Sequence, residues 1–262
     1  MADLNLENQL GPRLRSLKES GVEWLSPAPE LSIMVKQPDM FADDAETDRL
    51  NGSSLHEAET TPTDPEARRI ALAVLAGVVK ECQRCPELAS SRTQTVFGVG
   101  PVGAEILFVG EAPGGDEDRQ GVPFVGVAGQ LLNKIIAACG LRREEVFICN
   151  ILRCRPPGNR VPKPDECANC REYLEKTIDL VAPKIICCWG GVAAQNLLKT
   201  KTGITKLRGQ FYEFKGIPVI CTFHPASLLE GRSPQNKGLV WEDMKTMLAK
   251  IGKPIPTPKK KD

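Results

Sequence analysis

The sequence predicts an α/β protein whose mainly parallel sheet is covered by helices on both faces. Short apolar, β-branched runs alternate along the chain with longer segments whose apolar residues recur at helical spacing. This alternation of strands and helices is typical of parallel sheets buried between two helical layers. Ligands of such sheets bind in the crevice beyond the carboxyl ends of the strands, so the loops there are expected to carry the functional residues.

Residues 1–65 form an acidic leader that we expect to be largely disordered. They mix Pro, Asp, Glu, Ser and Thr with few aromatic residues, and they carry 13 acidic and 5 basic side chains. Leu14 to Leu25 hints at a short helix that could bind an unknown protein partner, and His56 is expected to be solvated. The folded domain then covers residues 66–252, and residues 253–262 form a basic tail.

The first helix of the domain is predicted over Glu66 to Lys80, and it delivers Cys82 and Cys85 at its end. The following stretch Gly98 to Gly103 (GVGPVG) spells a dinucleotide-binding fingerprint. That motif works only after a strand and at the start of a helix, whereas here the glycines precede the strand at Ile106 to Val109. We therefore interpret them as a turn-rich approach to the first strand.

A loop dense in Gly, Pro and acidic residues, Gly110 to Gly126, follows this strand and leads into a second helix. The apolar residues of this helix recur at helical spacing from Leu131 to Ile136, and Gly140 is placed to end it. Because the loop follows the carboxyl end of a strand, it should line a ligand site.

The rest of the domain continues the same alternation. The predicted strands are Val146 to Leu152, Lys184 to Trp189 and a hairpin of Phe211 to Phe214 with Ile217 to Thr222, and the predicted helices are Pro164 to Val181, Val192 to Lys199 and Gly238 to Ile251.

Three polar residues stand at or just beyond the ends of predicted strands. Glu111 follows the first strand, Asn150 lies near the end of the second, and His224 follows the last. Since the carboxyl ends of parallel strands meet at one edge of a sheet, we expect these side chains to gather there.

The formal net charge of +1 hides a basic domain, because residues 66–262 hold 29 basic and 20 acidic side chains. Such a domain fits a polyanionic partner such as nucleic acid, although solubility alone also produces this balance. No apolar run approaches the length of a membrane span, and the N-terminus lacks the order of a signal peptide. We expect a cytoplasmic protein with no membrane contact.

Ten cysteines in a chain without a secretory signal favour metal ligation or burial over disulfides. Cys82 and Cys85 could join Cys154 and Cys170 around a 4Fe-4S cluster. A structural zinc held by Cys82, Cys85, Cys167 and Cys170 is the alternative, and the spacing does not decide between them. A redox-active pair is disfavoured, because the CxxC does not open a helix after a strand. The remaining cysteines lie in apolar patterns and should be buried: Cys139, Cys149, Cys187, Cys188 and Cys221.

Three segments occur in order in this sequence: GEAPGGDEDRQGVPFVGVAGQLL, NILRCRPPGNR and FHPASLL. With the four cysteines, they closely resemble the family-4 uracil-DNA glycosylases, the iron–sulfur members of that superfamily, over residues 66–252. The resemblance implies a three-layer α/β/α sandwich around a mainly parallel four-stranded sheet. It also implies that Cys82, Cys85, Cys154 and Cys170 ligate a structural 4Fe-4S cluster, with Cys167 as a bystander.

The implied activity is hydrolysis of the N-glycosidic bond of a uracil flipped out of DNA, which leaves an abasic site in base excision repair. Phe124 corresponds to the ring that stacks on the base; its alternative role is a loop anchor in the core. Asn150 matches the amide that meets N3–H and O4 of uracil, a pattern that cytosine reverses. His224 corresponds to the donor to uracil O2, which stabilises the negative charge of the departing base.

One position departs from the better-known uracil glycosylases, which carry an Asp where this chain has Ala112. That Asp orients the attacking water, and the same replacement is usual in the iron–sulfur family. Glu111 is our candidate for positioning the water, although it could instead line the pocket and block the 5-methyl group of thymine. Gly110, Glu111 and Ala112 complete the implied uracil pocket.

We expect the protein to bind uracil-containing DNA as a monomer and to use basic and apolar residues near this edge. Leu228 and Leu229 are candidates for an apolar wedge in the minor groove, with helix packing as the alternative. The candidate phosphate contacts are Arg153, Arg155, Arg160, Lys163, Arg208 and Arg232.

We therefore predict a monofunctional uracil-DNA glycosylase, with two competing functions. The first is an iron–sulfur DNA-binding module without catalysis, which salt-sensitive DNA binding with no base release would indicate. The second is a metal-dependent hydrolase built on Asp116, Glu117 and Asp118, although the chain has too few histidines for most such sites. In a glycosylase these three residues would organise the loop instead.

Overall fold

The computed structural model describes residues 61–256. The helix hinted at over Leu14 to Leu25, His56 and the end of the basic tail lie outside these residues. The helices are α2 (Pro65–Lys80), α3 (Pro86–Ser91), α4 (Gly115–Gln120), α5 (Val127–Ala138), α6 (Pro164–Val181), α7 (Gly191–Leu198), α8 (Ile204–Leu207) and α9 (Lys237–Lys250), and the strands are β1 (Ile106–Gly110), β2 (Phe147–Asn150), β3 (Ile185–Trp189), β4 (Phe211–Phe214) and β5 (Ile217–Thr222).

The sheet has the strand order β2-β1-β3-β5-β4. Strands β2, β1, β3 and β5 run parallel, which is the predicted four-stranded parallel sheet. Strand β4 pairs antiparallel with β5 through the predicted hairpin and adds a fifth strand at the edge. The sheet therefore has one strand more than the four-stranded sheet that the resemblance implied, because the first strand of the predicted hairpin joins it.

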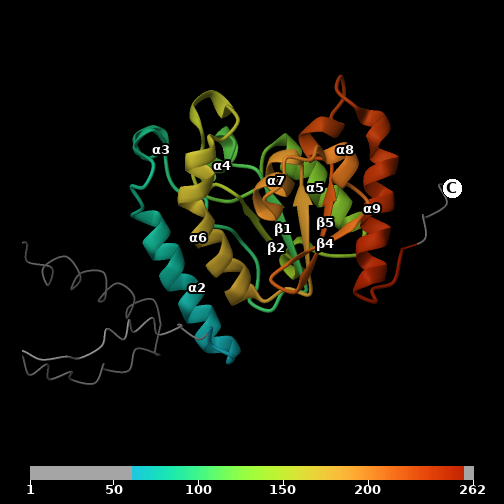
Figure 1. Ribbon diagram of the computed structural model, residues 1–262, viewed down its shortest axis with the longest axis horizontal. Helices are drawn as coiled ribbons and strands as arrows, with labels where there is room; N and C mark the ends of the chain where they lie inside the picture. The colour runs from blue at the N-terminus through green and yellow to red at the C-terminus, as the bar shows by residue number, and fades with distance from the viewer. Residues whose placement is uncertain (1–60, 257–262) are drawn as a thin grey trace, which may run out of the picture. The chain divides into compact units, whose positions relative to one another are not determined.

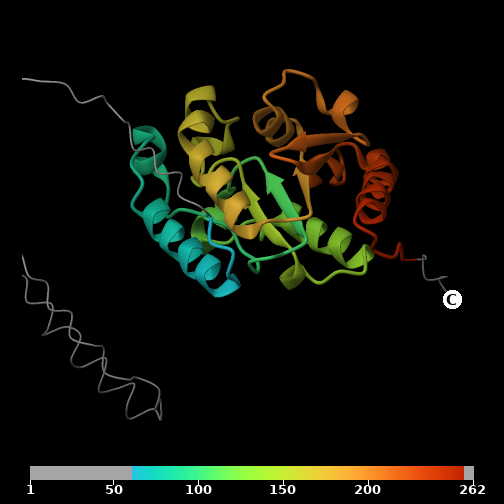
Figure 2. The ribbon, with the colours of Figure 1, turned by 60° about the horizontal axis from the view of Figure 1, so that its bottom comes forward.

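Helices cover both faces of the sheet, as Figures 1 and 2 show. On one face, α2 and α6 pack side by side, and their buried residues join α7 and α8 in a core cluster around Leu174, Ile186 and Val219. On the other face, α5 and α9 enclose a second cluster with Trp189 and Ile220. The three-layer α/β/α arrangement implied by the resemblance is confirmed.

The helix boundaries follow from capping. The Asp64 carboxylate accepts a hydrogen bond from the Ala67 amide at 2.8 Å, and Pro65 occupies the first position of α2, where no amide donor is needed. At the start of α6, the Glu166 carboxylate accepts from the Lys163 amide at 2.7 Å, and Pro164 stands at the first helical position. Both helices therefore begin within a residue of their predicted starts.

The glycine-rich stretch before β1 runs along the open edge of β2. The Val99 amide donates to the Ile148 carbonyl at 2.9 Å, and the Ile148 amide donates back at 2.8 Å. A Cβ at Gly100 would lie only 2.4 Å from the Val146 carbonyl oxygen, so this approach requires a residue without a side chain. The glycines serve backbone packing, which agrees with our rejection of the dinucleotide motif.

The five cysteines predicted to be structural are all buried, which confirms that prediction. None of the helices in the described part of the chain is long and apolar enough to cross a membrane.

Candidate active site

A cavity of about 430 Å³ lies at the carboxyl ends of the parallel strands. Gly110 ends β1 and is paired in register with Asn150, the last residue of β2, while His224 follows β5. Glu111, Asn150 and His224 all line the cavity together with Ala112 and Phe124. The prediction that these strand ends converge on one site is confirmed.

Asn150 presents a free side-chain amide to this cavity. The residue is only 2% exposed, yet its amide has no hydrogen-bond partner within residues 61–256. Its backbone carbonyl, in contrast, is fixed by the Nη1 atom of Arg153 at 2.9 Å. A buried amide on a fixed backbone, with its own donors and acceptor unused, is suited to reading the edge of a ligand.

Phe124 forms an apolar wall of the cavity and adopts an unusual backbone conformation. Its φ angle of 51° lies in the left-handed region, which costs a residue with a side chain about 1–3 kcal/mol. The ring packs so closely over Gly110 that a Cβ there would lie 2.5 Å from Cζ of Phe124 and 2.4 Å from Oδ1 of Asn150. Gly110 therefore belongs to the pocket because it leaves room for these two side chains.

His224 stands beside the Phe124 ring, with ring centroids 5.6 Å apart and planes inclined by 31°. Its Nδ1 atom accepts a hydrogen bond from the Ala226 amide at 3.2 Å, so the proton of the neutral ring resides on Nε2. Burial lowers the pKa of His224 to about 4. The imidazole is therefore neutral at physiological pH and retains Nε2–H as a donor for a ligand.

Glu111 is the carboxylate nearest to the strand ends. Burial raises the pKa of its side chain, and the carboxylate has no hydrogen bond to another part of residues 61–256. Its backbone is held by the Leu152 amide, which donates to the Glu111 carbonyl at 3.1 Å. A half-buried carboxyl group without a hydrogen-bond partner can take a proton from water or exclude a ligand group by its bulk.

The acidic residues of the loop after β1 hold that loop together, as predicted. Glu117 accepts hydrogen bonds from the amides of Gly114, Val125 and Gly126 at 2.9–3.1 Å. The Asp118 carboxylate accepts from the Thr93 amide at 3.0 Å. These residues also form α4, a short helix inside the segment that we predicted as a plain loop.

A family model of the uracil DNA glycosylase superfamily matches residues 97–245, which hold this whole cavity. The chain belongs to this superfamily. It is 43% identical over 187 residues to a type-4 uracil-DNA glycosylase of Archaeoglobus fulgidus, an overlap that covers 68% of this chain and 92% of that protein. A type-4 uracil-DNA glycosylase of Thermotoga maritima is 44% identical over 168 residues, or 63% of this chain and 87% of that protein.

The four cysteines proposed as cluster ligands of this glycosylase-superfamily chain lie on neighbouring segments of one core. Cys154 and Cys170 are buried, and Cys82 and Cys85 pack partly buried against the same cluster of residues. Burial raises the pKa of the Cys170 thiol to about 11; the neighbouring Arg153 opposes this shift, and Cys154 and Cys85 add to it. Cys167 is buried on α6 as well.

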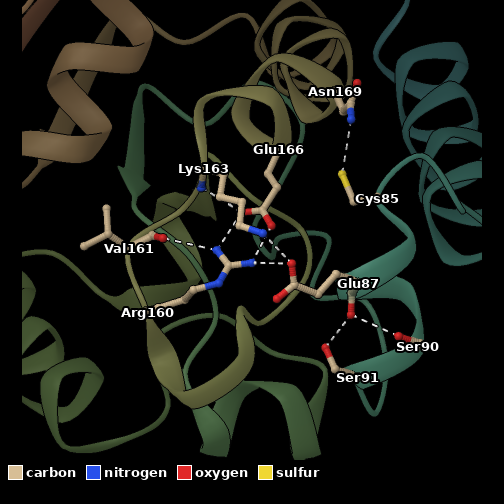
Figure 3. A network of polar contacts seen from close by, with 9 residues as sticks. All are labelled: Cys85, Glu87, Ser90, Ser91, Arg160, Val161, Lys163, Glu166 and Asn169. Carbon is tan, nitrogen blue, oxygen red and sulfur yellow. Dashed lines mark hydrogen bonds and ion pairs between the residues drawn. The ribbon is translucent and has the colours of Figure 1, made fainter.

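Polar groups reach the sulfur atoms of this cysteine group from outside. The Arg92 guanidinium donates to Sγ of Cys154 at 3.0 Å and to the Cys82 carbonyl at 2.8 Å. The Asn169 amide donates to Sγ of Cys85 at 3.4 Å, as Figure 3 shows. Nothing in the sequence singled out Arg92 or Asn169, because neither belongs to a recognisable motif.

Three predicted DNA contacts are wrong, because the side chains serve the interior. Arg153 is 1% exposed and donates to Asn150 and Thr177. Arg208 pairs with the buried Asp243 at 2.6 Å. Leu228 is 1% exposed within the core beneath α5 and α9, which is the packing role that we weighed as the alternative to a wedge.

The other DNA-contact candidates stay at the surface near the cavity. Arg155 is half-buried, with its Nε atom 2.8 Å from Oδ1 of Asn159, and Arg232 is exposed at the rim of the cavity. Leu229 is half-buried at the end of the turn after His224.

Arg160 and Lys163 are less free, as Figure 3 shows. The Arg160 guanidinium meets Glu166 at 2.6 Å and Glu87 at 3.2 Å, and Lys163 meets Glu87 at 2.6 Å. These ion pairs join the loop after β2 to α3 and α6. The first task of the two bases is therefore to fix that loop beside the cavity.

Proposed function

We propose that this protein is a uracil-DNA glycosylase of the type-4 kind, which hydrolyses the N-glycosidic bond of deoxyuridine and leaves an abasic site for base excision repair. The observation that carries the proposal is one cavity in which a free buried amide, an aromatic wall and a neutral histidine donor face the same space. Those are the three contacts that a flat base with polar edges requires.

The reaction begins with the nucleotide turned out of the DNA stack into the cavity. Phe124 stacks on the flat face of the uracil, and the Asn150 amide accepts from N3–H while donating to O4. Cytosine presents the reverse pattern at these two atoms and would leave polar groups unpaired in a buried site. Ala112 lines the cavity with a small side chain that leaves space for the base, and Gly110 leaves room for the side chains of Phe124 and Asn150 that contact it.

Bond cleavage then separates charge. As the glycosidic bond breaks, the sugar becomes cationic and the uracil gains negative charge at O2. The neutral His224 donates Nε2–H to that oxygen and needs no change in its own protonation. Glu111 is the group that we assign to position the water, because its carboxyl group faces the cavity without a hydrogen-bond partner in the described chain.

We also propose that Cys82, Cys85, Cys154 and Cys170 hold a 4Fe-4S cluster. Arg153 supports this, because the guanidinium is 1% exposed and its Nε atom is left without a hydrogen-bond partner. Within residues 61–256 the Arg153 guanidinium has no carboxylate partner, and the backbone of the same residue reaches the Cys170 thiol. A buried cation requires a counter-charge, and a thiolate-ligated cluster carries negative charge.

A single zinc ion fits these residues less well than a cluster. Zinc draws four ligands onto one atom, whereas each thiolate of a 4Fe-4S cluster binds a different iron, so the sulfur atoms stay further apart. Across residues 61–256, no three His, Cys, Asp or Glu side chains converge closely enough to hold one metal ion. A bound cluster would supply iron–thiolate bonds that join the segment after α2 to the end of β2 and to α6.

DNA would contact the rim of the cavity. The candidates that remain are Arg155 and Arg232 for phosphates and Leu229 for a wedge between bases. We expect the protein to act as a monomer in the cytoplasm, where its thiols stay reduced.

The test is incubation of the purified protein with a labelled oligonucleotide that holds one uracil, in EDTA, followed by alkaline cleavage of abasic sites. We expect uracil-dependent cleavage that falls at least 100-fold in His224→Ala. Asn150→Asp should lose selectivity against cytosine. Thymine and cytosine oligonucleotides are the substrate controls, and Glu213→Gln on the edge strand β4 is the control variant.

A cluster-loaded protein that binds DNA yet releases no uracil would overturn this proposal and favour the binding module. Loss of cleavage in EDTA would instead favour a metal-dependent hydrolase.

A further inference from the structure

The left-handed backbone conformation of Phe124 requires stabilising contacts from its surroundings. The residue lies in the left-handed region at φ 51°, and its ring is 5% exposed between Gly110 and His224. An unrestrained loop would relax toward an ordinary conformation, which would swing the ring away from the cavity. The surroundings must therefore supply contacts that exist only in the strained state.

The contacts come from Arg143, which lies outside the cavity in the turn between α5 and β2. Its Nη1 atom donates to the Phe124 carbonyl at 3.1 Å, and its Nη2 atom donates to the Pro123 carbonyl at 2.5 Å. Nη1 also meets Oδ1 of Asn133 at 2.6 Å. One planar guanidinium thus fixes two successive carbonyl groups, which the point charge of a lysine cannot do in the same geometry.

Helix α5 also packs directly against the backbone of Phe124, at Gly129. A Cβ at Gly129 would lie 2.0 Å from both the carbonyl carbon and the carbonyl oxygen of Phe124. Only a glycine at this position lets the helix approach so closely. The Phe124 peptide is therefore clamped between Gly129 and the guanidinium.

Arg143 has no competing task in the described chain. It forms no ion pair with a carboxylate there, unlike its neighbour Arg142, which pairs with Glu145. The side chain is half-buried, and this burial lowers the pKa of its guanidinium. Part of the hydration of the charge is therefore replaced by hydrogen bonds to the carbonyl groups. A half-buried guanidinium whose partners are two loop carbonyls and the Asn133 amide oxygen on α5 is suited to tying the loop to that helix.

We propose that Arg143 is a positioning residue that holds the Phe124 ring parallel to the flipped base. The proposal rests on the proposed function, because its consequence is measured on the stacked uracil. Arg143 acts on the site through the loop backbone at Pro123 and Phe124: it does not line the cavity itself.

The experiment compares Arg143→Met and Arg143→Lys with Arg142→Met, the exposed neighbour, in single-turnover release of uracil from DNA. We expect kcat/KM to fall about tenfold in both Arg143 variants and to stay within about twofold of wild type in Arg142→Met. Inhibition by free uracil should weaken by a similar factor, because the base loses its stacking surface. Asn133→Ala is a milder variant that keeps Arg143 and removes only its third contact, with about a twofold effect expected.

A double-mutant cycle separates positioning from general stability. In a Phe124→Ala background, Arg143→Met should change kcat/KM by less than twofold, since no ring remains to be positioned. An equal loss with and without the ring would overturn the proposal, as would wild-type kinetics in Arg143→Met. A crystal structure of Arg143→Met should show Phe124 outside the left-handed region, and this result tests Arg143 even if wild type releases no uracil, the outcome that defeats the proposed function.

Discussion

His224 combines two properties that burial makes possible. The pKa of the imidazole is lowered to about 4 because the charged form would lose its hydration. The bond from the Ala226 amide to Nδ1 then fixes which nitrogen carries the proton. A protonated ring would have to give up this bond, because Nδ1 would become a donor facing another donor.

The pH dependence of activity follows from this. We expect the contribution of His224 to kcat/KM to persist to about pH 5 and to be lost only as the pH approaches 4, whereas an ordinary histidine would titrate near 6.5. Protonation of Glu111, whose pKa is raised by burial, adds an acid limb of its own that Glu111→Gln removes. Rates of uracil release between pH 4 and pH 8, with buffers of constant ionic strength, measure it. An acid limb centred near pH 6.5 would contradict a neutral buried His224.

Stability should depend on the same group with a defined sign. The unfolded chain takes up the proton near pH 6.5 and the folded protein only near 4, so protonation favours the unfolded state between these values. The free energy of unfolding should therefore fall as the pH drops from 6.5 to 4, by up to about 1.4 kcal/mol per pH unit. Above pH 6.5 His224 should cause no further change with pH. Urea unfolding of wild type and His224→Gln isolates the contribution, since the variant should lack this part of the slope.

Gly110 offers a test at the scale of one methyl group. Gly110→Ala would place a Cβ 2.4 Å from Oδ1 of Asn150 and 2.5 Å from Cζ of Phe124, so both groups would shift. We expect kcat/KM to fall on the order of 100-fold, since displacements of about 1 Å in an active site cost that much. The matched control is Gly77→Ala in α2, where the new methyl group meets nothing within 4 Å and should stabilise the helix by about 0.5–1 kcal/mol. Equal activity of the two variants would show that the pocket has room to spare.

Among the elements, the end of β2 and the C-terminal half of α6 are joined through Arg153. This side chain donates to the Asn150 carbonyl and to Oγ1 of Thr177 on α6, and its own chain continues directly into Cys154. The guanidinium thus holds the strand end that carries Asn150, and the backbone of the same residue lies next to Cys154 and near the Cys170 thiol.

Replacing Arg153 should therefore be felt at both places. We expect Arg153→Met to lower the free energy of unfolding by about 1–3 kcal/mol, because two buried acceptors lose their donor. In the cluster-loaded protein the midpoint potential should fall, since removal of a nearby positive charge disfavours the added electron. Voltammetry of the cluster measures this, with Arg153→Lys as the variant that keeps the charge. An unchanged potential in Arg153→Met would show that the two groups do not interact.

The strands and the long helices could be predicted from sequence, and the short helices could not. Helix α6 matches its predicted range because Pro164, Glu166 and an apolar stripe all agree. Helices α3, α4 and α8 contain four to six residues each and carry too few turns for a periodic signal. They are stabilised by tertiary contacts such as Asp118 with Thr93, which no local pattern reveals.

The site shows the same division. Strand order brought Asn150 and His224 together as predicted, because both follow from the parallel topology. The burial of Arg153 and Arg208 was missed, since an arginine in a basic loop looks alike whether it faces DNA or a buried acceptor. Arg143 gave no signal either, because its partners are backbone carbonyls that the sequence does not display.

For the whole molecule, the excess of basic residues predicts binding to DNA that weakens with salt. Each phosphate contact releases counter-ions, so Arg155→Gln or Arg232→Gln should lower the slope of log affinity against log salt by about 1. Arg208→Gln is the control, because its guanidinium is engaged by Asp243 and Leu239. It should leave the slope unchanged and lower stability instead. Fluorescence anisotropy with labelled DNA at several salt concentrations measures all three, and equal slopes in every variant would exclude these arginines from the interface.

The Val99 bridge along β2 also has a consequence for behaviour at high concentration. The unpaired amides and carbonyls of an open edge strand can form hydrogen bonds with another molecule, and this pairing leads to aggregation. Here Ile148, on the outer edge of the strand that carries Asn150, forms both of its edge hydrogen bonds with Val99 of the same chain, at 2.8 and 2.9 Å. A bulky residue at Gly100 would push this cover away, and the protein should then aggregate through the uncovered edge. The glycine-rich stretch that resembles a nucleotide-binding motif is therefore expected to reduce self-association by covering the edge of β2.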